Sequence, residues 1–263
     1  MLGKLLKHEF RATGRIMWPL YLVLLFLSFC ANLSIRQFDS ADSIILNILG
    51  GLIMTVYVIA IIGVCVMSVV LMINRFRTNL MSNEGYVMFT LPVSVHQLVW
   101  SKIIVSTVWF VATFLAVALS GLIVSFRVEY VTDFIASLQE LFRQFTAYFA
   151  LNGAAFLLET LVLVFLSSAA VCLLFYAAMA VGHSFANHKI LLSVAFFFVF
   201  QLAAQLVVSI SALGLNGLDM NWNLEPVGAV HAAMGVGIAC TLIYGAVFYV
   251  ITTVMLKKHL NLE

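Results

Sequence analysis

Charged residues are scarce in this chain of 263 residues. Only 9% of them are Asp, Glu, Lys or Arg, while 64% are hydrophobic. A typical soluble domain has about 25% charged residues. A soluble protein of this size could not bury so much apolar surface, so lipid must cover it. The composition therefore excludes a soluble globular protein and predicts an integral membrane protein.

The chain also lacks the short motifs of common catalytic sites. It has no Gly-x-x-x-x-Gly-Lys-Ser/Thr phosphate loop, so it cannot hydrolyse ATP by that route. His8-Glu9 has no second His at the spacing of a zinc motif, and His183 and His188 are poorly spaced for one helix face. No Ser–His pair has the spacing of a dyad. We therefore expect no enzyme activity, no catalytic residue, no metal and no cofactor in this chain.

Cysteines are few, and their spacing matches no metal motif. All four lie inside apolar runs: Cys30, Cys65, Cys172 and Cys240. Thiols held in lipid do not make a disulfide framework. We interpret them as small apolar residues.

What the chain does contain is six long apolar runs. They cover residues 17–33, 44–73, 103–126, 151–181, 190–213 and 232–256. About 20 apolar residues are needed to cross the hydrocarbon core of a bilayer. Backbone groups in lipid must be hydrogen-bonded within the segment, so each run is expected to be a helix. The predicted fold is all-α, with six transmembrane helices in one transmembrane domain over residues 1–263.

The basic residues are distributed unequally between the two sides. With both termini on one side, ten of the 13 Lys and Arg residues fall on that side. The other three are Arg36, Arg127 and Arg143, and most acidic residues share their side. The positive-inside rule then places both termini in the cytoplasm. We expect a multi-pass protein of the cell membrane.

The first 16 residues have the pattern of an interfacial amphipathic helix. The apolar face would carry Leu2, Leu5, Leu6 and Phe10. The basic face would carry Lys4, Lys7, Arg11 and Arg15. Such a helix lies with its basic face toward anionic headgroups. A plain positive-inside anchor is the alternative, and we favour the interfacial helix.

On the outer side, residues 127–150 form a second amphipathic segment with apolar residues at helical spacing. It could gate a substrate path, but a connector lying on the membrane surface is the interpretation we favour.

Three polar residues fall inside the apolar runs. Glu159 lies eight residues into the fourth run, where an ionisable residue is a candidate for lining a path. That run is longer than a bilayer requires, so we favour a position at the outer headgroups. Gln201 and Gln205 share one face of the fifth helix. They could line a path, and packing against another helix is the interpretation we favour.

The segment 74–102 is unusually long for a cytoplasmic connection. Pro92 disfavours a helix at the residue before it, and Ser94 with Gln97 has the pattern of a capping box for the third span. Upstream, a short helix is predicted with Glu84 in its first turn, near the positive end of the helix dipole. Its aromatic residues suit a docking surface for another protein or an aromatic belt in the headgroups, and the residues alone fit both.

The stretch EGYVMFTLPVSVHQLVWSK, residues 84–102, resembles the corresponding loop of permease subunits of type-2 ATP-binding-cassette (ABC) transporters. The chain length, the basic N-terminus and the six-span layout are similar too. The short bacterial permeases associated with bacitracin-like and lantibiotic peptides, which are antimicrobial, are the most similar. The local resemblance is concentrated in about twenty residues and includes no catalytic signature.

The resemblance implies that segment 74–102 is a coupling loop whose short helix sits in a groove of a separate ATPase subunit. Carried over to this chain, the contact residues are Glu84, Gly85, Tyr86 and Phe89. ATP and Mg²⁺ would be bound by the ATPase. A second permease chain, identical or not, would complete the complex in the bilayer, and we expect no nucleic acid among the partners. The expected function is export of a peptide, a lipid or a hydrophobic drug.

Two alternatives stay open. An ion-coupled carrier would have inverted halves of three helices on either side of segment 127–150, although the sequence shows no matched broken helices. A non-transporting membrane subunit, such as an immunity or assembly factor, would also fit the composition. A neighbouring gene with a phosphate loop and an ABC signature would favour the permease.

Overall fold

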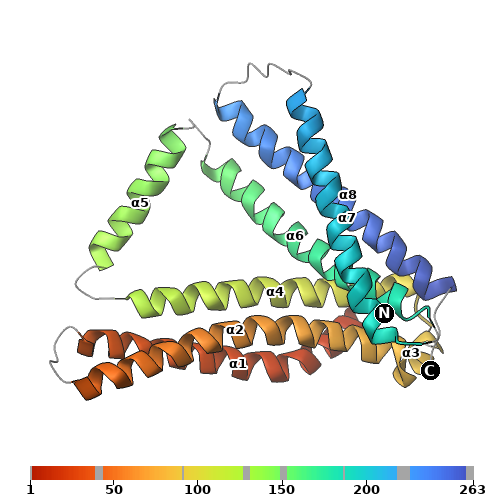
Figure 1. The fold of residues 1–263 in the computed structure, drawn as a ribbon, viewed down its shortest axis with the longest axis horizontal. Coiled ribbons are helices and arrows are strands. Elements are labelled where there is room, and N and C mark those ends of the chain that lie inside the picture. The colour runs from red at the N-terminus through yellow and green to blue at the C-terminus, as the bar shows by residue number, and fades with distance from the viewer. Residues whose placement is uncertain are drawn as a thin grey trace.

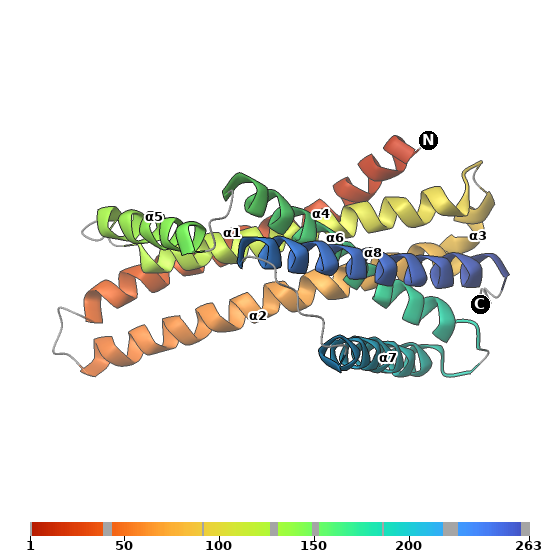
Figure 2. The ribbon, with the colours of Figure 1, turned by 90° about the horizontal axis from the view of Figure 1, so that it is seen from above.

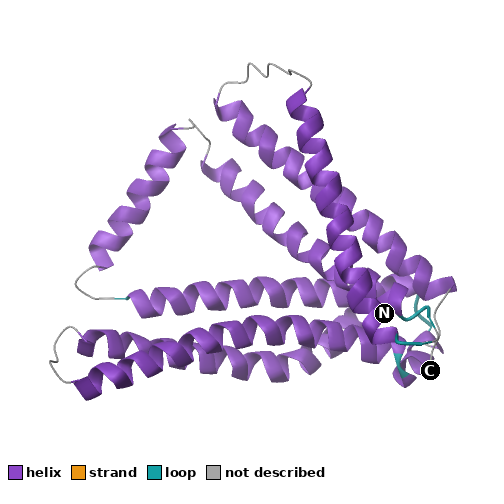
Figure 3. Ribbon diagram, viewed as in Figure 1, coloured by secondary structure: helices purple, strands orange, loops and turns teal. Residues whose placement is uncertain are grey.

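The computed structural model describes residues 2–38, 44–90, 92–126, 131–148, 153–185, 187–217 and 226–258. Within these ranges every regular element is a helix, as Figure 3 shows. The elements are α1 (Leu2–Phe38), α2 (Ile44–Met81), α3 (Asn83–Thr90), α4 (Val95–Ser125), α5 (Val131–Tyr148), α6 (Gly153–Gly182), α7 (Lys189–Gly217) and α8 (Pro226–Lys258).

Six of these helices are long and apolar enough to cross a membrane, namely all except α3 and α5. The predicted all-α, multi-pass membrane fold is confirmed. The helices run further than the predicted spans at several ends. At 37 and 38 residues, α1 and α2 are each about 55 Å long, which exceeds a hydrocarbon core of about 30 Å.

The spans form two arms. The first arm consists of α1, α2 and α4, and the second of α6, α7 and α8 (Figure 1). Within each arm, the first helix packs against both of the others. The arms converge at the end of the molecule where α1 begins, where α8 ends and where α3 lies, and they diverge toward the other end (Figure 1). We call the shared end the basic end, because Lys4, Lys7, Arg75, Arg77, Lys189 and Lys257 lie there.

The core is divided in the same way. One cluster of buried residues lies within the first arm and includes Met17, Leu24 and Trp109. The other joins α2, α4, α6 and α8 where the arms meet. There the rings of Phe76 and Tyr176 stack with centroids 3.9 Å apart. The two arms are therefore held together by packing near the basic end.

The helices α7 and α8 are poorly covered by the rest of the chain. Only 6% of the apolar window of each is buried, against 28% to 39% in the other four spans. Figure 2 shows α7 lying to one side of the other helices. Their outer faces must therefore meet lipid or another chain.

The helix α5 connects the two arms at their divergent ends (Figure 1). It confirms that the predicted outer amphipathic segment contains a helix, with Phe142 exposed. Arg143 donates two hydrogen bonds to Glu140, each 2.8 Å long, and Gln144 donates a third. These bonds lower the pKa of Glu140 to about 2.

All four cysteines are free thiols.

Candidate functional site

The short helix α3 is placed where the loop resemblance predicted a coupling helix. It follows α2 after one residue, Ser82, and the Gly85 amide donates to the Ser82 carbonyl oxygen at 2.7 Å. Glu84, in its first turn, is exposed, and so is 55% of Tyr86. Gly85 is buried, and the side chain of Phe89 lies outside the described part of the chain. The helix therefore presents a carboxylate and an aromatic ring at the basic end.

The start of α4 is fixed by the capping box that the sequence predicted. The Gln97 amide donates to Ser94 Oγ at 3.3 Å, and the Ser94 amide donates to Gln97 Oε1 at 3.4 Å. Most of the predicted loop 74–102 is consequently helical, because α2 continues to Met81 and α4 begins at Val95. The segment between these two long helices thus contains the short helix α3.

A buried ion pair lies near the two helix ends that flank this element. Lys102 Nζ, on α4, donates to Glu9 Oε1, on α1, at 2.6 Å, and the side chains are only 3% and 9% exposed. Asn79 Nδ2, near the end of α2, donates to the same oxygen at 3.2 Å. The three residues therefore join the first three spans at one point, within four residues of Ser82 along α2. A buried carboxylate is tolerated only with such partners.

The sequence analysis missed this pair. It treated Lys102 as one of the basic residues of the loop and Glu9 as part of an incomplete zinc motif. One signal was available, because Glu9 is the only acidic residue among the first 38 and is one helical turn from Leu5 and Thr13. A lone carboxylate on the buried face of a helix needs a cation from another helix.

Further polar contacts continue from the ion pair along the whole length of α1 and α4. Trp109 Nε1 donates to Thr13 Oγ1 at 2.7 Å, and the Tyr21 hydroxyl lies 2.8 Å from Thr113 Oγ1. At the far end, Asn32 Nδ2 donates to the Phe126 carbonyl oxygen at 2.7 Å. We call this set of contacts the polar seam. Together with the Glu9–Lys102 pair, which we count as part of the seam, these contacts join α1 to α4 at four levels, so we expect the two helices to move as one body.

The N-terminal segment is part of this assembly. The expected helix over the first 16 residues is present, but it continues without interruption into the first span as α1. Leu5, Leu6 and Phe10 are partly buried against the two core clusters of the protein. The four basic residues predicted to face the headgroups are all exposed: Lys4, Lys7, Arg11 and Arg15. Their contact with lipid stays a prediction, whereas part of the apolar face meets protein.

Glu159 is paired with a residue that the sequence analysis did not consider. His231 Nδ1, on α8, lies 2.9 Å from both carboxylate oxygens of Glu159, on α6. Each side chain is 28% exposed. The pair joins α6 to α8 at the divergent end of the second arm, far from the basic end. Glu159 therefore has a structural role there. A path-lining role for Glu159 stays a prediction.

Gln201 and Gln205 are both exposed on α7. The interpretation that they pack against another helix therefore needs a helix from outside this chain. An exposed amide in a hydrocarbon environment is unfavourable unless a partner or water meets it.

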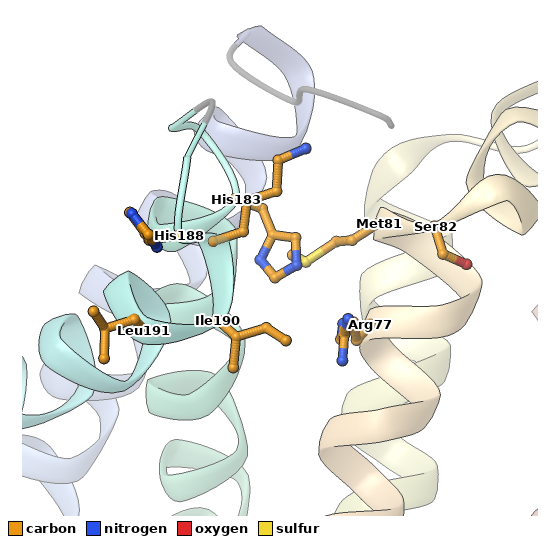
Figure 4. A pocket seen from close by; sticks show the side chains of 8 residues that line it. Arg77, Met81, Ser82, His183, His188, Ile190 and Leu191 are labelled. Carbon is orange, nitrogen blue, oxygen red and sulfur yellow. The ribbon is translucent and has the colours of Figure 1, made fainter.

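Two adjoining cavities lie at the basic end between α2 and the junction of α6 with α7. The outer cavity has a volume of about 520 Å³ and the inner one about 270 Å³. Figure 4 shows His183, Met81 and Arg77 approaching one another across the outer cavity. His183 is 4% exposed, and burial lowers the pKa of its imidazole. The nearby charge of Arg77 lowers this pKa further.

Among the described residues, no group of His, Cys, Asp and Glu side chains could hold a metal ion. Searches against protein-family models, curated proteins and solved structures gave no match to this chain. The described features at the basic end are an exposed short helix, a buried ion pair that joins three spans, and a basic cavity.

Proposed function

We propose that this chain is the membrane-spanning permease subunit of an ABC transporter and that α3 is its coupling helix. The observation that carries the proposal is the placement of α3. It exposes Glu84 and Tyr86 at the basic end, and it is held between the ends of α2 and α4. An exposed aromatic ring beside a carboxylate is a suitable anchor for a groove on a soluble protein.

The buried ion pair would turn movement of α3 into movement of the first arm. Asn79 and Lys102, from the helices on either side of α3, both donate to Glu9. The polar seam then extends this connection along α1 and α4. A push on α3 would consequently displace α1, α2 and α4 as one body relative to the second arm. The stacked rings of Phe76 and Tyr176 lie where the arms meet, so we propose this contact as the pivot.

The direction across the membrane follows from the basic residues. We propose that the basic end faces the cytoplasm, where a soluble ATPase can reach α3 and supply ATP and Mg²⁺. Cysteine variants at Lys4 and at Glu140, in a chain lacking the four native cysteines, test this orientation. A membrane-impermeant reagent added outside should label position 140 and not position 4. The reverse pattern would refute the orientation.

A second permease chain would cover the exposed spans. The helices α7 and α8 are the least buried, and α7 exposes the amides of Gln201 and Gln205. We propose that two such chains, identical or related, enclose a path for export of a peptide, a lipid or a hydrophobic drug. Two ATPase subunits would bind beneath them.

The test is co-purification of the full chain with an ATPase encoded by a neighbouring gene. A complex is expected to survive extraction in detergent and to hydrolyse ATP faster when its substrate is added. A chain that stays monomeric, and that changes neither the binding nor the activity of any such ATPase, would contradict the proposal. It would favour a non-transporting immunity or assembly subunit.

One observation favours a second candidate, the ion-coupled carrier. In both arms the first helix, α1 or α6, packs against the other two helices. In both arms an acidic residue on that first helix also contacts a basic residue on the third helix, α4 or α8. These pairs are Glu9 with Lys102 and Glu159 with His231. Such a correspondence is expected of inverted repeats. Uptake into liposomes that is driven by a pH gradient, with no ATPase present, would support the carrier over the permease.

A further inference from the structure

The two cavities at the basic end share part of their lining. Arg77, His183 and Ile190 border both the outer and the inner one. The outer cavity opens at the basic end, and the inner one continues along α6 between α2 and α7. The pair therefore offers one continuous space with an entrance beside the headgroups and an extension beside the hydrocarbon core.

The outer cavity is basic. Arg77 of α2 lies on one side, and His188 and Lys189 lie on the other, at the start of α7. None of the residues that line either cavity is acidic. Among the described residues, the Arg77 side chain has no hydrogen-bond or ion-pair partner. Burial lowers the pKa of the His183 imidazole, and the charges of Arg77 and Lys189 lower it further, so both cations lie near this ring. An unneutralised arginine facing a second cation is the arrangement that binds an anion, above all a phosphate.

The inner cavity is apolar. Phe175, Ala178 and Met179 of α6 form its floor. Ile73 of α2 lies on one wall, and Val194 and Phe197 of α7 lie on the other. Val194 and Ile190 are half exposed or more, so the wall formed by α7 opens sideways to the surroundings of the spans. A soluble protein cannot reach this opening, whereas a lipid in the adjoining leaflet can.

The turn between α6 and α7 holds this space in shape. A Cβ added to Gly182 would lie 2.5 Å from the Ser193 amide nitrogen, so only Gly permits the two helices to approach here. The His183 ring is fixed by a hydrogen bond of 2.9 Å between Nδ1 and the Met179 carbonyl oxygen. His188 has a φ of 56°, an unfavourable conformation for a residue with a side chain. Strained backbone of this kind gathers at functional sites.

We infer that the two cavities form one binding site for an anionic phospholipid of the leaflet at the basic end. Arg77 and Lys189 would bind the phosphate, and an acyl chain would lie along α6 between α2 and α7. The inference does not rest on the proposed transporter. It requires only that the chain crosses a membrane, and the apolar extension favours a lipid over an acidic side chain from a protein partner.

The experiment uses the full chain, purified in a neutral detergent. Phosphatidylglycerol and phosphatidylcholine with the same two acyl chains are added, and the bound lipid is counted by native mass spectrometry. We expect the unaltered protein to retain phosphatidylglycerol about tenfold more tightly, as charge-assisted contacts to a lipid anion imply. The double variant Arg77→Gln with Lys189→Gln should lose this preference. The matched control Arg75→Gln, two residues away and outside both cavities, should keep it.

A second pair of variants tests the apolar half without changing charge. Val194→Trp fills the inner cavity and should reduce retention of both lipids, whereas Val199→Trp, equally exposed but outside the cavity, should not. Thermal unfolding confirms that each variant is folded.

Equal retention of the two lipids, or an unchanged preference in the double variant, would overturn the inference. So would full displacement of phosphatidylglycerol by soluble glycerol 3-phosphate, which would indicate a site for a free anion. Loss of ATPase binding with an unchanged lipid preference would reassign these residues to a protein interface.

Discussion

Lys102 Nζ lies 2.6 Å from Glu9 Oε1 in the interior of the first arm, where both side chains are almost fully shielded. The two residues are 93 positions apart in the chain. Removing one partner leaves the other buried and uncompensated, which typically costs about 3 to 5 kcal/mol. We expect Glu9→Gln and Lys102→Met each to lower the free energy of unfolding by about that amount.

The control and the rescue follow from the same geometry. Arg11→Gln changes an exposed charge on the same helix and should change stability by less than about 0.5 kcal/mol. The double variant Glu9→Gln with Lys102→Met should recover much of the loss, since no unpaired charge remains. Unfolding by heat or denaturant in detergent is measured for the four variants and for the unaltered protein. Single variants as stable as Arg11→Gln would mean that the ion pair is not buried in solution.

Gly182 is predicted to be irreplaceable, whereas another helical glycine is dispensable. A Cβ on Gly182 would lie 2.6 Å from Ser193 Cα, so Gly182→Ala must push α6 and α7 apart and should cost roughly 1 to 3 kcal/mol. A Cβ on Gly121, in α4, meets nothing within 4 Å. Gly121→Ala is therefore expected to raise stability by up to about 1 kcal/mol through helix propensity. Thermal unfolding that shifts in the same direction for both variants would contradict the packing at the α6–α7 junction.

The coupling-helix proposal predicts a selective loss of partner binding. Truncation of a central aromatic residue in such an interface typically costs about 2 kcal/mol or more. Tyr86→Ala combined with Phe89→Ala should leave the membrane protein folded but release the ATPase. Glu84→Lys should weaken the same contact by reversing a charge.

Pull-down from detergent, normalised to expression, measures this loss. Phe26→Ala, which removes an exposed aromatic ring from α1, serves as the control and should bind the ATPase normally. If the aromatics of α3 formed only a belt in the headgroups, the double variant would retain its partner in full. That outcome would remove the main support for a permease.

The pair of Glu159 with His231 is expected to contribute to stability. In a double-mutant cycle with Glu159→Ala and His231→Ala, a coupling energy of roughly 1 kcal/mol is expected for a half-buried charge-assisted contact. Thermal unfolding of the four proteins gives this value. Thr160→Val is the neighbouring control, since its hydroxyl donates to the Phe156 carbonyl oxygen of its own helix. A coupling energy near zero would show that the two helices do not meet there.

The sequence was sufficient for the features that depend on local rules. Lipid imposes a simple requirement on length and composition, so the six spans could be predicted. The capping box at Ser94 and Gln97 is a contact over three residues and could be predicted for the same reason. The partners of Glu9 and Glu159 are 93 and 72 residues away, and no local pattern pairs them. The helix ends at Phe38 and Met81 lie beyond the predicted spans, because hydropathy marks an apolar run and not the polar turns by which a helix continues past it.

The polar seam also constrains how the protein is made. Apart from Asn79 of α2, which also donates to Glu9, the cross-helix partners that α1 finds along the seam lie on α4 or at its C-cap, and they are synthesised about ninety residues later. At roughly 5 to 20 residues per second, roughly 5 to 20 seconds pass in which Glu9 lacks its lysine partner and the Tyr21 hydroxyl and the Asn32 amide lack their partners from α4. Completion of α4 ends this interval and closes the first arm before any residue of the second has been made. Membrane insertion of this chain is therefore a process of two stages, in which the N-terminal half is the more exposed to misassembly and quality control.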